Sequence, residues 1–474
     1  MIRELTKLED LEKQLDLWIE VTRAAEAELN EPQPRPALER NGVDKEAVQQ
    51  MSNLLAKAKD ELNEAKQEVA ENEAKDGEPD KSVYIASHPN LSMVQSIMHS
   101  GYMVGGQVET TAAQGASGSA SAGAEMSLSQ DALTPPQKLF GGIFDEPGPG
   151  YAVGWLAGVT YSVFQKTQPF RKPGPMVKLG NKARIVVAGD WGTGHARAQA
   201  IGKMMQQCLE EAAPDQDRHV VHLGDIYFSG LPSECSSRFL SYWPSQPAPD
   251  VKHWSTNGNH DMYCGGKGYF QVVLGDQRFS AQRFSSNFSF GNDHWQFIGL
   301  DTAYDEWRLS SVKTGNQAVW AAGLIKDAPN AKRVLLSHHQ PWSDYEGNKP
   351  AKAGAVAVDA APLMADGKTA AWLWGHEHRC AIYNPLQPAG WVHALPFGSC
   401  IGHSGVPCKP TKEQGPNARH VLLDSTAGVI PGNVGETYGL MGFAVIDIDG
   451  DQAEIRYYHE LDPQMTSPHF TASL

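Results

Sequence analysis

Five short segments between Asp190 and His378 carry side chains of the kinds that bind metal ions. They read Gly189-Asp190-Trp191-Gly192, Gly224-Asp225, Gly258-Asn259-His260-Asp261, His338-His339 and Gly375-His376-Glu377-His378. These carboxylate, amide and imidazole donors, without a thiolate, suit Mn, Fe, Zn or Co better than Ca or a structural zinc–cysteine site. If one carboxylate bridges two such ions, the pair can generate hydroxide and hold a phosphoryl group. The pattern therefore predicts hydrolysis of a phosphate ester.

Two other catalytic patterns are absent from the sequence. A serine hydrolase of the α/β type carries a Gly-x-Ser-x-Gly turn, which does not occur in this chain. The run Gly367-Lys368-Thr369 matches the end of a phosphate-binding loop, but Pro362 stands where that loop needs its first glycine. Neither a serine nucleophile nor a nucleotide-binding loop is therefore expected.

Short apolar runs come directly before most of the five segments, as strands would. Strands are predicted at 184–188, 219–223, 294–300, 333–337 and 371–374, a helix at 196–212, and a hairpin at 442–458 around Asp449-Gly450-Asp451. Strands that alternate with helices indicate an α/β architecture. Polar residues at the ends of such strands place the site at the carboxyl edge of a sheet.

Residues 180–462 resemble the calcineurin-like metallophosphoesterase family, nearest its purple acid phosphatase-like branch, because all five segments occur in the family's order. The resemblance implies an α/β fold, a four-layer sandwich of two stacked mixed β-sheets flanked by helices. It also implies a dinuclear metal-dependent phosphoric ester hydrolase, in which a metal-bound hydroxide attacks a phosphate mono- or diester. The ions would be two divalent or Fe-type ions, with Mn, Fe or Zn favoured.

The resemblance also assigns a role to each matching residue. It implies a first ion held by Asp190, Asp225 and His378. It implies a second ion held by Asp225, Asn259, His339 and His376, with Asp225 bridging. His339 is preferred over the adjacent His338 because His339-Gln340-Pro341 fits the His-x-Pro form of that segment. His260 matches the acid that protonates the leaving oxygen, and Asp261 is expected to orient it.

The first ion's ligand set departs from the family pattern at two positions. Most members have a histidine where this chain has Gly192, and purple acid phosphatases compensate with a tyrosine where this chain has Phe228. A tyrosine stands one residue earlier, at Tyr227. Since neighbouring strand residues point to opposite faces, a tyrosinate–iron site is not expected. Tyr227, His195 or water remain as alternatives for completing the first site.

Composition limits the partners that the protein can have. The 474 residues carry a formal net charge of −15, which disfavours binding to nucleic acid or to anionic membranes. A small phosphate ester or a phosphoprotein is the expected substrate, and mono- and diesters both remain open. The first residues lack the apolar core of a secretory signal, and the 6 cysteines form no Cys-x-x-Cys pair, so a cytoplasmic location is predicted.

The part of the chain before the phosphoesterase-like region divides by composition. Residues 1–100 are predicted to form a helical hairpin or coiled-coil-like extension, 101–131 a flexible Gly/Ala/Ser linker and 132–179 an irregular extension. Residues 180–462 are predicted to form the metallophosphoesterase-like domain, and 463–474 a tail. The N-terminal helices could support a homo-oligomer. Two alternatives to an enzyme are a binding protein whose metal site has decayed and a scaffold built on these helices.

Overall fold

The computed structural model describes residues 168–474 except 228, 245–249, 305–311, 344–351, 354, 384, 388–390, 407–419, 424–426 and 430–436. The helical extension and the linker predicted before residue 132 lie outside the described residues, as do Phe228 and all but the last part of the extension predicted at 132–179. In the part that is described, no helix is long and apolar enough to cross a membrane.

One of the two large sheets has six strands and contains the first predicted strands. Its order is β18 (Phe470–Ser473), β17 (Gln452–His459), β16 (Gly442–Asp449), β2 (Lys182–Ala188), β3 (Asp217–His222) and β4 (Lys252–Ser255). Strands β2, β3 and β4 run parallel, while β16, β17 and β18 pair antiparallel. The strands predicted at 184–188 and 219–223 and the hairpin at 442–458 are confirmed. The segment 463–474, predicted as a tail, contributes β18 to the sheet.

The other large sheet has eight strands. Its order is β1 (Val177–Lys178), β5 (Phe288–Gly291), β6 (Trp295–Leu300), β7 (Lys332–Ser337), β10 (Thr369–Trp374), β12 (Phe397–Ile401), β11 (Cys380–Tyr383) and β13 (His420–Leu423). Strands β6, β7, β10 and β12 form a parallel centre, and antiparallel pairs occur on both sides of it. Two small antiparallel pairs join β8 (Trp342–Ser343) to β9 (Lys352–Ala353) and β14 (Ala427–Val429) to β15 (Thr437–Gly439).

Strand β2 shows why the sheets stack and why helices cover them. Ile185 and Val187 point into a core shared by both sheets, while Val186 and Ala188 point to the other face and pack under α7 (Ala196–Glu210). Both faces of β2 are therefore buried, as in other parallel strands whose sequences are apolar throughout.

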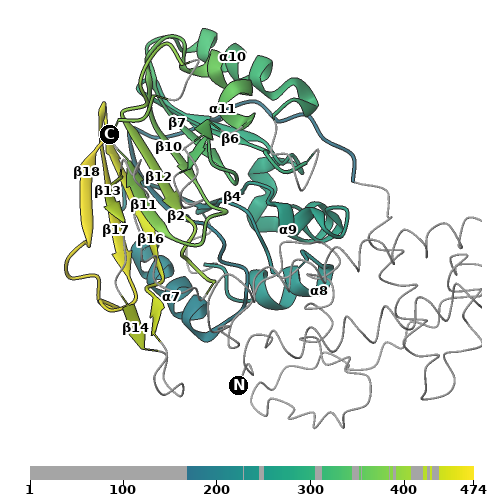
Figure 1. Cartoon of the computed structure of the whole chain (residues 1–474), viewed down its shortest axis with the longest axis vertical. Coiled ribbons are helices and arrows are strands. Elements are labelled where there is room, and N and C mark those ends of the chain that lie inside the picture. Colours follow the sequence, from purple (N-terminus) through teal and green to yellow (C-terminus); the bar gives the residue numbers. More distant parts are fainter. Residues whose placement is uncertain are drawn as a thin grey trace, which may run out of the picture. The chain divides into compact units, whose positions relative to one another are not determined.

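Helical segments cover the outer face of each sheet. On the six-stranded sheet these are α7, the π-helical η2 (Cys235–Leu240) and η3 (Gly268–Val273), and η4 (Gln277–Gln282). On the eight-stranded sheet they are α10 (Gln317–Asp327), α11 (Ala355–Asp359) and η6 (Ala361–Met364). The short α8 (Pro232–Glu234), α9 (Asn259–Met262) and η5 (Thr314–Asn316) follow β3, β4 and β6 in the chain. Figure 1 shows α10 and α11 beside β6, β7 and β10, and α7 beside β16. The four-layer α/β fold is the one expected.

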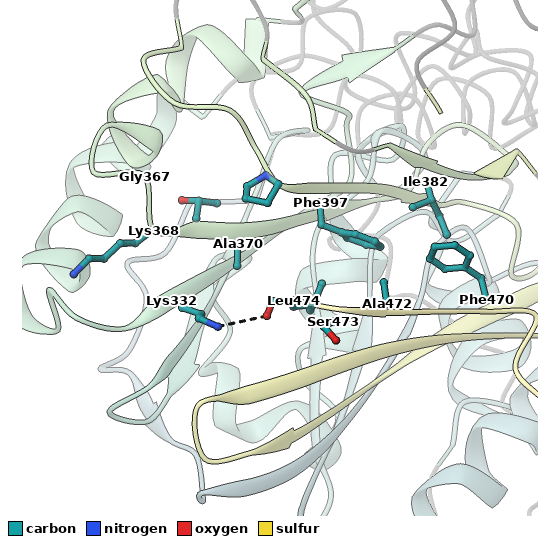
Figure 2. A pocket seen from close by; sticks show the side chains of 12 residues that line it. Lys332, Gly367, Lys368, Ala370, Ile382, Phe397, Phe470, Ala472, Ser473 and Leu474 are labelled. Atoms are coloured by element: carbon teal, nitrogen blue, oxygen red, sulfur yellow. Dashed lines mark hydrogen bonds between the residues drawn. The ribbon is translucent and has the colours of Figure 1, made fainter. Parts of the chain in front are cut away.

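The two edges of the parallel strands differ in chemistry. At the amino ends of β7, β10 and β12 there is a largely apolar cavity of about 480 Å³, lined in part by Phe397 and Phe470 (Figure 2). At its rim Lys332 Nζ donates to the carbonyl of Leu474 over 3.4 Å. The polar segments of the sequence lie at the opposite, carboxyl ends of the strands.

Candidate metal centre

Each of the five polar segments begins at or just after the last residue of a parallel strand. Asp190 and Asp225 follow β2 and β3, and Asn259 opens α9 four residues after the end of β4. His338 and His376 follow β7 and β10 of the other sheet. The site therefore lies where the carboxyl ends of both parallel groups meet, the usual position for ligands in such folds.

The backbone of the site is strained at three of these residues. Asp190, Asp225 and His376 have positive φ angles of 56°, 71° and 67°. Such conformations cost about 1–3 kcal/mol each for non-glycine residues and persist only where the surrounding structure imposes them. Two glycines make the close approach possible, because a Cβ atom at Gly258 would collide with the Asp225 carboxylate and one at Gly375 with that of Asp190.

Each buried carboxylate uses one oxygen to tie two loops together. Asp190 Oδ2 accepts from the backbone N–H of His376 over 2.8 Å, and Asp225 Oδ1 accepts from that of His260 over 2.9 Å. The side chains of Asp190 and Asp225 are 0 % and 1 % exposed. A buried negative charge is costly unless it is paired. The remaining oxygens, Asp190 Oδ1 and Asp225 Oδ2, are the ones placed to bind a cation.

Four donor atoms from Asp190, Asp225, Tyr227 and His378 converge around the first of these positions. Tyr227 Oη lies within hydrogen-bonding distance of both carboxylates, 2.7 Å from Asp190 Oδ1 and 3.2 Å from Asp225 Oδ2. His378 Nε2 lies 2.8 Å from Tyr227 Oη and 3.4 Å from Asp190 Oδ1. Separations of this size between donors are what ligands show when they share one ion at bond lengths of about 2.0–2.2 Å.

The orientation of Tyr227 overturns the argument made from strand alternation. That argument pointed Tyr227 away from the ligand face, yet its hydroxyl lies among the ligands. The reason is that β3 ends at His222, so that Tyr227 belongs to a turn in which side chains need not alternate. The alternative residue, His195, instead caps α7, where its Nδ1 accepts from the backbone N–H of Arg197 over 3.2 Å.

A second donor set shares Asp225 with the first. Asn259 Oδ1 lies 3.0 Å from both His338 Nε2 and His376 Nδ1, and His338 Nε2 lies 3.3 Å from Asp225 Oδ2. His338 Nδ1 donates to the carbonyl of Leu223 over 2.8 Å, which directs its Nε2 into the site. A hydrogen bond of this kind is the usual way that a protein fixes a histidine ligand.

His338 and His339 occupy different places in this arrangement. Donor atoms of both fall in one cluster with His376, and His338 also clusters with Asp190 and Asp225. His339 is positioned by Thr302. Its Nδ1 lies 3.1 Å from Thr302 Oγ1, and its backbone N–H donates to the same oxygen over 3.0 Å. Of the pair, His338 makes the direct contacts with Asp225 and Asn259, whereas the family resemblance favoured His339 as the ligand.

The charge states of the three imidazoles follow from burial and from Asp225. Burial alone would lower the pKa of His338, but the Asp225 carboxylate raises it to about 9. Burial lowers the pKa of His376 to about 3 and that of His339 well below its usual value, so both are neutral. Neutral imidazoles are ready to bind metal, and an ion beside Asp225 would replace the extra proton of His338.

His260 lies beside both donor sets. Its Nε2 is 4.0 Å from Asp225 Oδ2, and its ring lies between those of Tyr227 and Tyr263, at centroid distances of 4.7 and 4.6 Å. The His260 side chain is 6 % exposed. The two tyrosine rings therefore hold this imidazole at the margin of the site.

Asp261 ties two loops of the site together. Its carboxylate accepts backbone N–H groups from Asp225, Ile226 and Gly258 over 3.1, 3.2 and 2.9 Å. These bonds hold the turn after β3 against the start of α9. The orienting role expected for Asp261 toward His260 thus acts through the backbone that carries both residues.

Three supporting residues carry no signal in the sequence. Tyr263, Thr302 and Arg379 lie outside the five segments, and each bonds a residue inside them. Tyr263 Oη accepts from Asn259 Nδ2 over 2.8 Å, and Arg379 pairs with Glu377 over 2.9 Å in a buried ion pair. Tyr263 and Arg379 lie close in the sequence to the residues they bond, so a supporting role could have been suspected for them. Thr302 is far from its partner, His339, and could not have been found in this way.

Comparisons with known proteins give one family match and several distant structural likenesses. Residues 183–380 match the model of the calcineurin-like phosphoesterase family. A purple acid phosphatase from yellow lupin is 14% identical with a TM-score of 0.43; the alignment covers 63% of this chain but only 55% of that enzyme. GAP50, described as the anchor in the inner membrane complex of Plasmodium, has the same identity and TM-score, over 62% of this chain and 88% of that one. No curated protein matches the chain.

Proposed function

We propose that this protein, whose residues 183–380 match the model of the calcineurin-like phosphoesterase family, is a dinuclear metal-dependent hydrolase of phosphate mono- or diesters. The observation that carries the proposal is the position of Asp225 Oδ2. It lies 3.2 Å from Tyr227 Oη in the first donor set and 3.3 Å from His338 Nε2 in the second. One carboxylate oxygen shared by two donor sets is what a bridging ligand requires.

The donors fit two ions of the Mn, Zn or Fe type. The first would be held by Asp190, Asp225, Tyr227 and His378. The second would be held by Asp225, Asn259, His338 and His376, with His339 beside it. When bound, such ions lower the pKa of a water nucleophile and neutralise charge on the phosphoryl group. The mixture of oxygen and imidazole donors, without a described thiolate among them, suits these metals.

The chain's own residues hold the metal donors in place and provide a proton for the leaving group. Strained loops anchored by Asp190, Asp225 and Asp261 hold the donors in place before substrate arrives, which is the source of electrostatic preorganisation. His260, outside both donor sets, gives its proton to the leaving oxygen of the ester. The reaction class is thus phosphoester hydrolysis with a general acid.

Metal content and turnover of the full chain test the proposal together. We expect two ions per chain and hydrolysis of p-nitrophenyl phosphate, bis-p-nitrophenyl phosphate or both, lost on chelation and restored by Mn. The relative rates on the two esters decide between monoesterase and diesterase. Protein that takes up no metal when Mn is supplied and turns over neither ester would remove the enzyme assignment and favour a binding protein built on this fold.

Tyr227→Phe is expected to weaken the first ion's binding at least tenfold, because even supporting residues around metal ligands are worth about 10–100-fold in affinity. Activity should fall at least in parallel at limiting metal. If the wild type is loaded with Fe(III), a phenolate ligand gives it visible absorption, and this band should vanish in the variant. The measurements are metal affinity and the visible spectrum.

Tyr457→Phe is the matched control for this variant. Tyr457 is also fully buried, and its hydroxyl donates to Ser399 Oγ over 2.7 Å, outside the donor sets. It should leave metal affinity and spectrum unchanged. Equal metal affinity in Tyr227→Phe and the wild type would show that Tyr227 is not a ligand.

A further inference from the structure

Tyr263 contacts two residues of the site while providing none of its metal donors. It is the first residue after α9, is 4 % exposed, and accepts a hydrogen bond from Asn259 Nδ2 over 2.8 Å. Its ring also lies 4.6 Å from that of His260. The hydroxyl and the ring therefore act on different neighbours.

The hydrogen bond matters because the two ends of an amide are chemically opposite. The oxygen of Asn259 can bind a cation, whereas its NH₂ group only donates hydrogen bonds. Asn259 Oδ1 faces His338 Nε2 and His376 Nδ1 at 3.0 Å each, while Nδ2 faces Tyr263. An ion beside Oδ1 would fix the amide in this orientation, and Tyr263 then accepts from the NH₂ group on the other side.

We propose that Tyr263 is a positioning residue that holds the Asn259 amide by its NH₂ group, with Oδ1 toward the second ion, and thereby raises the affinity of that ion. This inference rests on the dinuclear site proposed above. Asn259 belongs to the second donor set alone, so the effect should be confined to the ion held by Asp225, Asn259, His338 and His376. Tyr227 belongs to the first donor set. The two tyrosines thus act on different ions.

Tyr263→Phe isolates the hydroxyl, because the ring beside His260 is retained. Loss of the acceptor leaves the Asn259 NH₂ buried without this partner while Oδ1 faces the ion, so the geometry that binds the ion becomes less favourable. We expect the second ion to bind about 10–100-fold more weakly, the range found for partners of metal ligands. The first ion should keep the wild-type affinity.

Mn(II) titration of the full chain by calorimetry, with electron paramagnetic resonance of the same samples, measures both ions. At a Mn concentration that saturates the wild type, Tyr263→Phe should hold one ion per chain and lack the magnetic coupling of a bridged pair. Higher Mn concentrations should restore the coupled signal, a recovery that misfolded protein would not show. Tyr263→Met, which also lacks the hydroxyl but fills apolar space, should lose the same ion.

Tyr269→Phe is the matched control, because this nearby buried tyrosine donates to the carbonyl of Ser255 over 2.6 Å and is not bonded to the site. It should bind two ions as the wild type does. The inference would be overturned if Tyr263→Phe bound a coupled pair with unchanged affinity. It would also be overturned if both ions bound equally more weakly in Tyr263→Phe or in Tyr269→Phe. A wild type that binds no coupled pair would instead remove the dinuclear site, and the inference with it.

Discussion

Asp225→Asn is expected to abolish binding of both ions and to lower kcat/KM by more than about 10³-fold. Even one transition-state donor is worth about 10²–10³ in rate, and Asp225 serves two donor sets at once. Its Oδ2 lies within 3.3 Å of donors on both sides, from Tyr227 and His338. Asparagine keeps the shape of the side chain and can still accept the His260 N–H, so the loss reports charge and not folding.

The matched control is the same change at an exposed position. Asp215 forms a surface ion pair with Lys182 over 2.9 Å and its side chain is 61 % exposed. Such pairs contribute little to stability, so Asp215→Asn should keep the wild-type metal content, rate and melting temperature. Metal analysis of both variants, followed by kcat/KM with added Mn, makes the comparison. Two tightly bound ions in Asp225→Asn would show that this carboxylate does not bridge.

The sequence predicted the parallel strands well because they are buried on both faces and therefore read as apolar runs. The runs that end at Asp190, Asp225 and His338 became β2, β3 and β7 with small changes at their ends. The short strands β5, β11 and β12 were not predicted. They contain Gly, Ser or Cys, and β5 and β12 pair with β1 and β10 as well as with their chain neighbours, which a local pattern does not reveal. The assignment of strands to two sheets came from the family resemblance.

The chemistry of the site was readable from the sequence, while its orientations were not. Residue types and order predicted the candidate donors, because metal ligands must be of particular kinds. The direction of Tyr227 was misjudged because a strand rule was applied to a turn. The preference for His339 over His338 came from a spacing to Pro341, whereas the contacts of the imidazoles depend on how β7 meets Leu223 and Thr302. Such contacts join residues far apart in the sequence.

His260→Gln is expected to reduce kcat by about 10²–10⁴-fold on esters with poor leaving groups and to leave metal content unchanged. The ring of His260 lies 4.0 Å from Asp225 Oδ2 and belongs to neither donor set. Its removal should therefore not release the ions. Glutamine can fill part of the space between Tyr227 and Tyr263 but has no acidic proton to give to a leaving alkoxide.

The dependence on the leaving group separates a general acid from other roles of His260. A p-nitrophenolate departs without much protonation, whereas phenolate and alkoxides need it. The loss in kcat should therefore be small with p-nitrophenyl phosphate and large with phenyl phosphate, measured side by side at saturating Mn. If His260 instead held the substrate or an ion, both esters would slow equally, or metal would be lost. An equal loss on the two esters would thus contradict the assignment of His260 as the acid, even if activity fell.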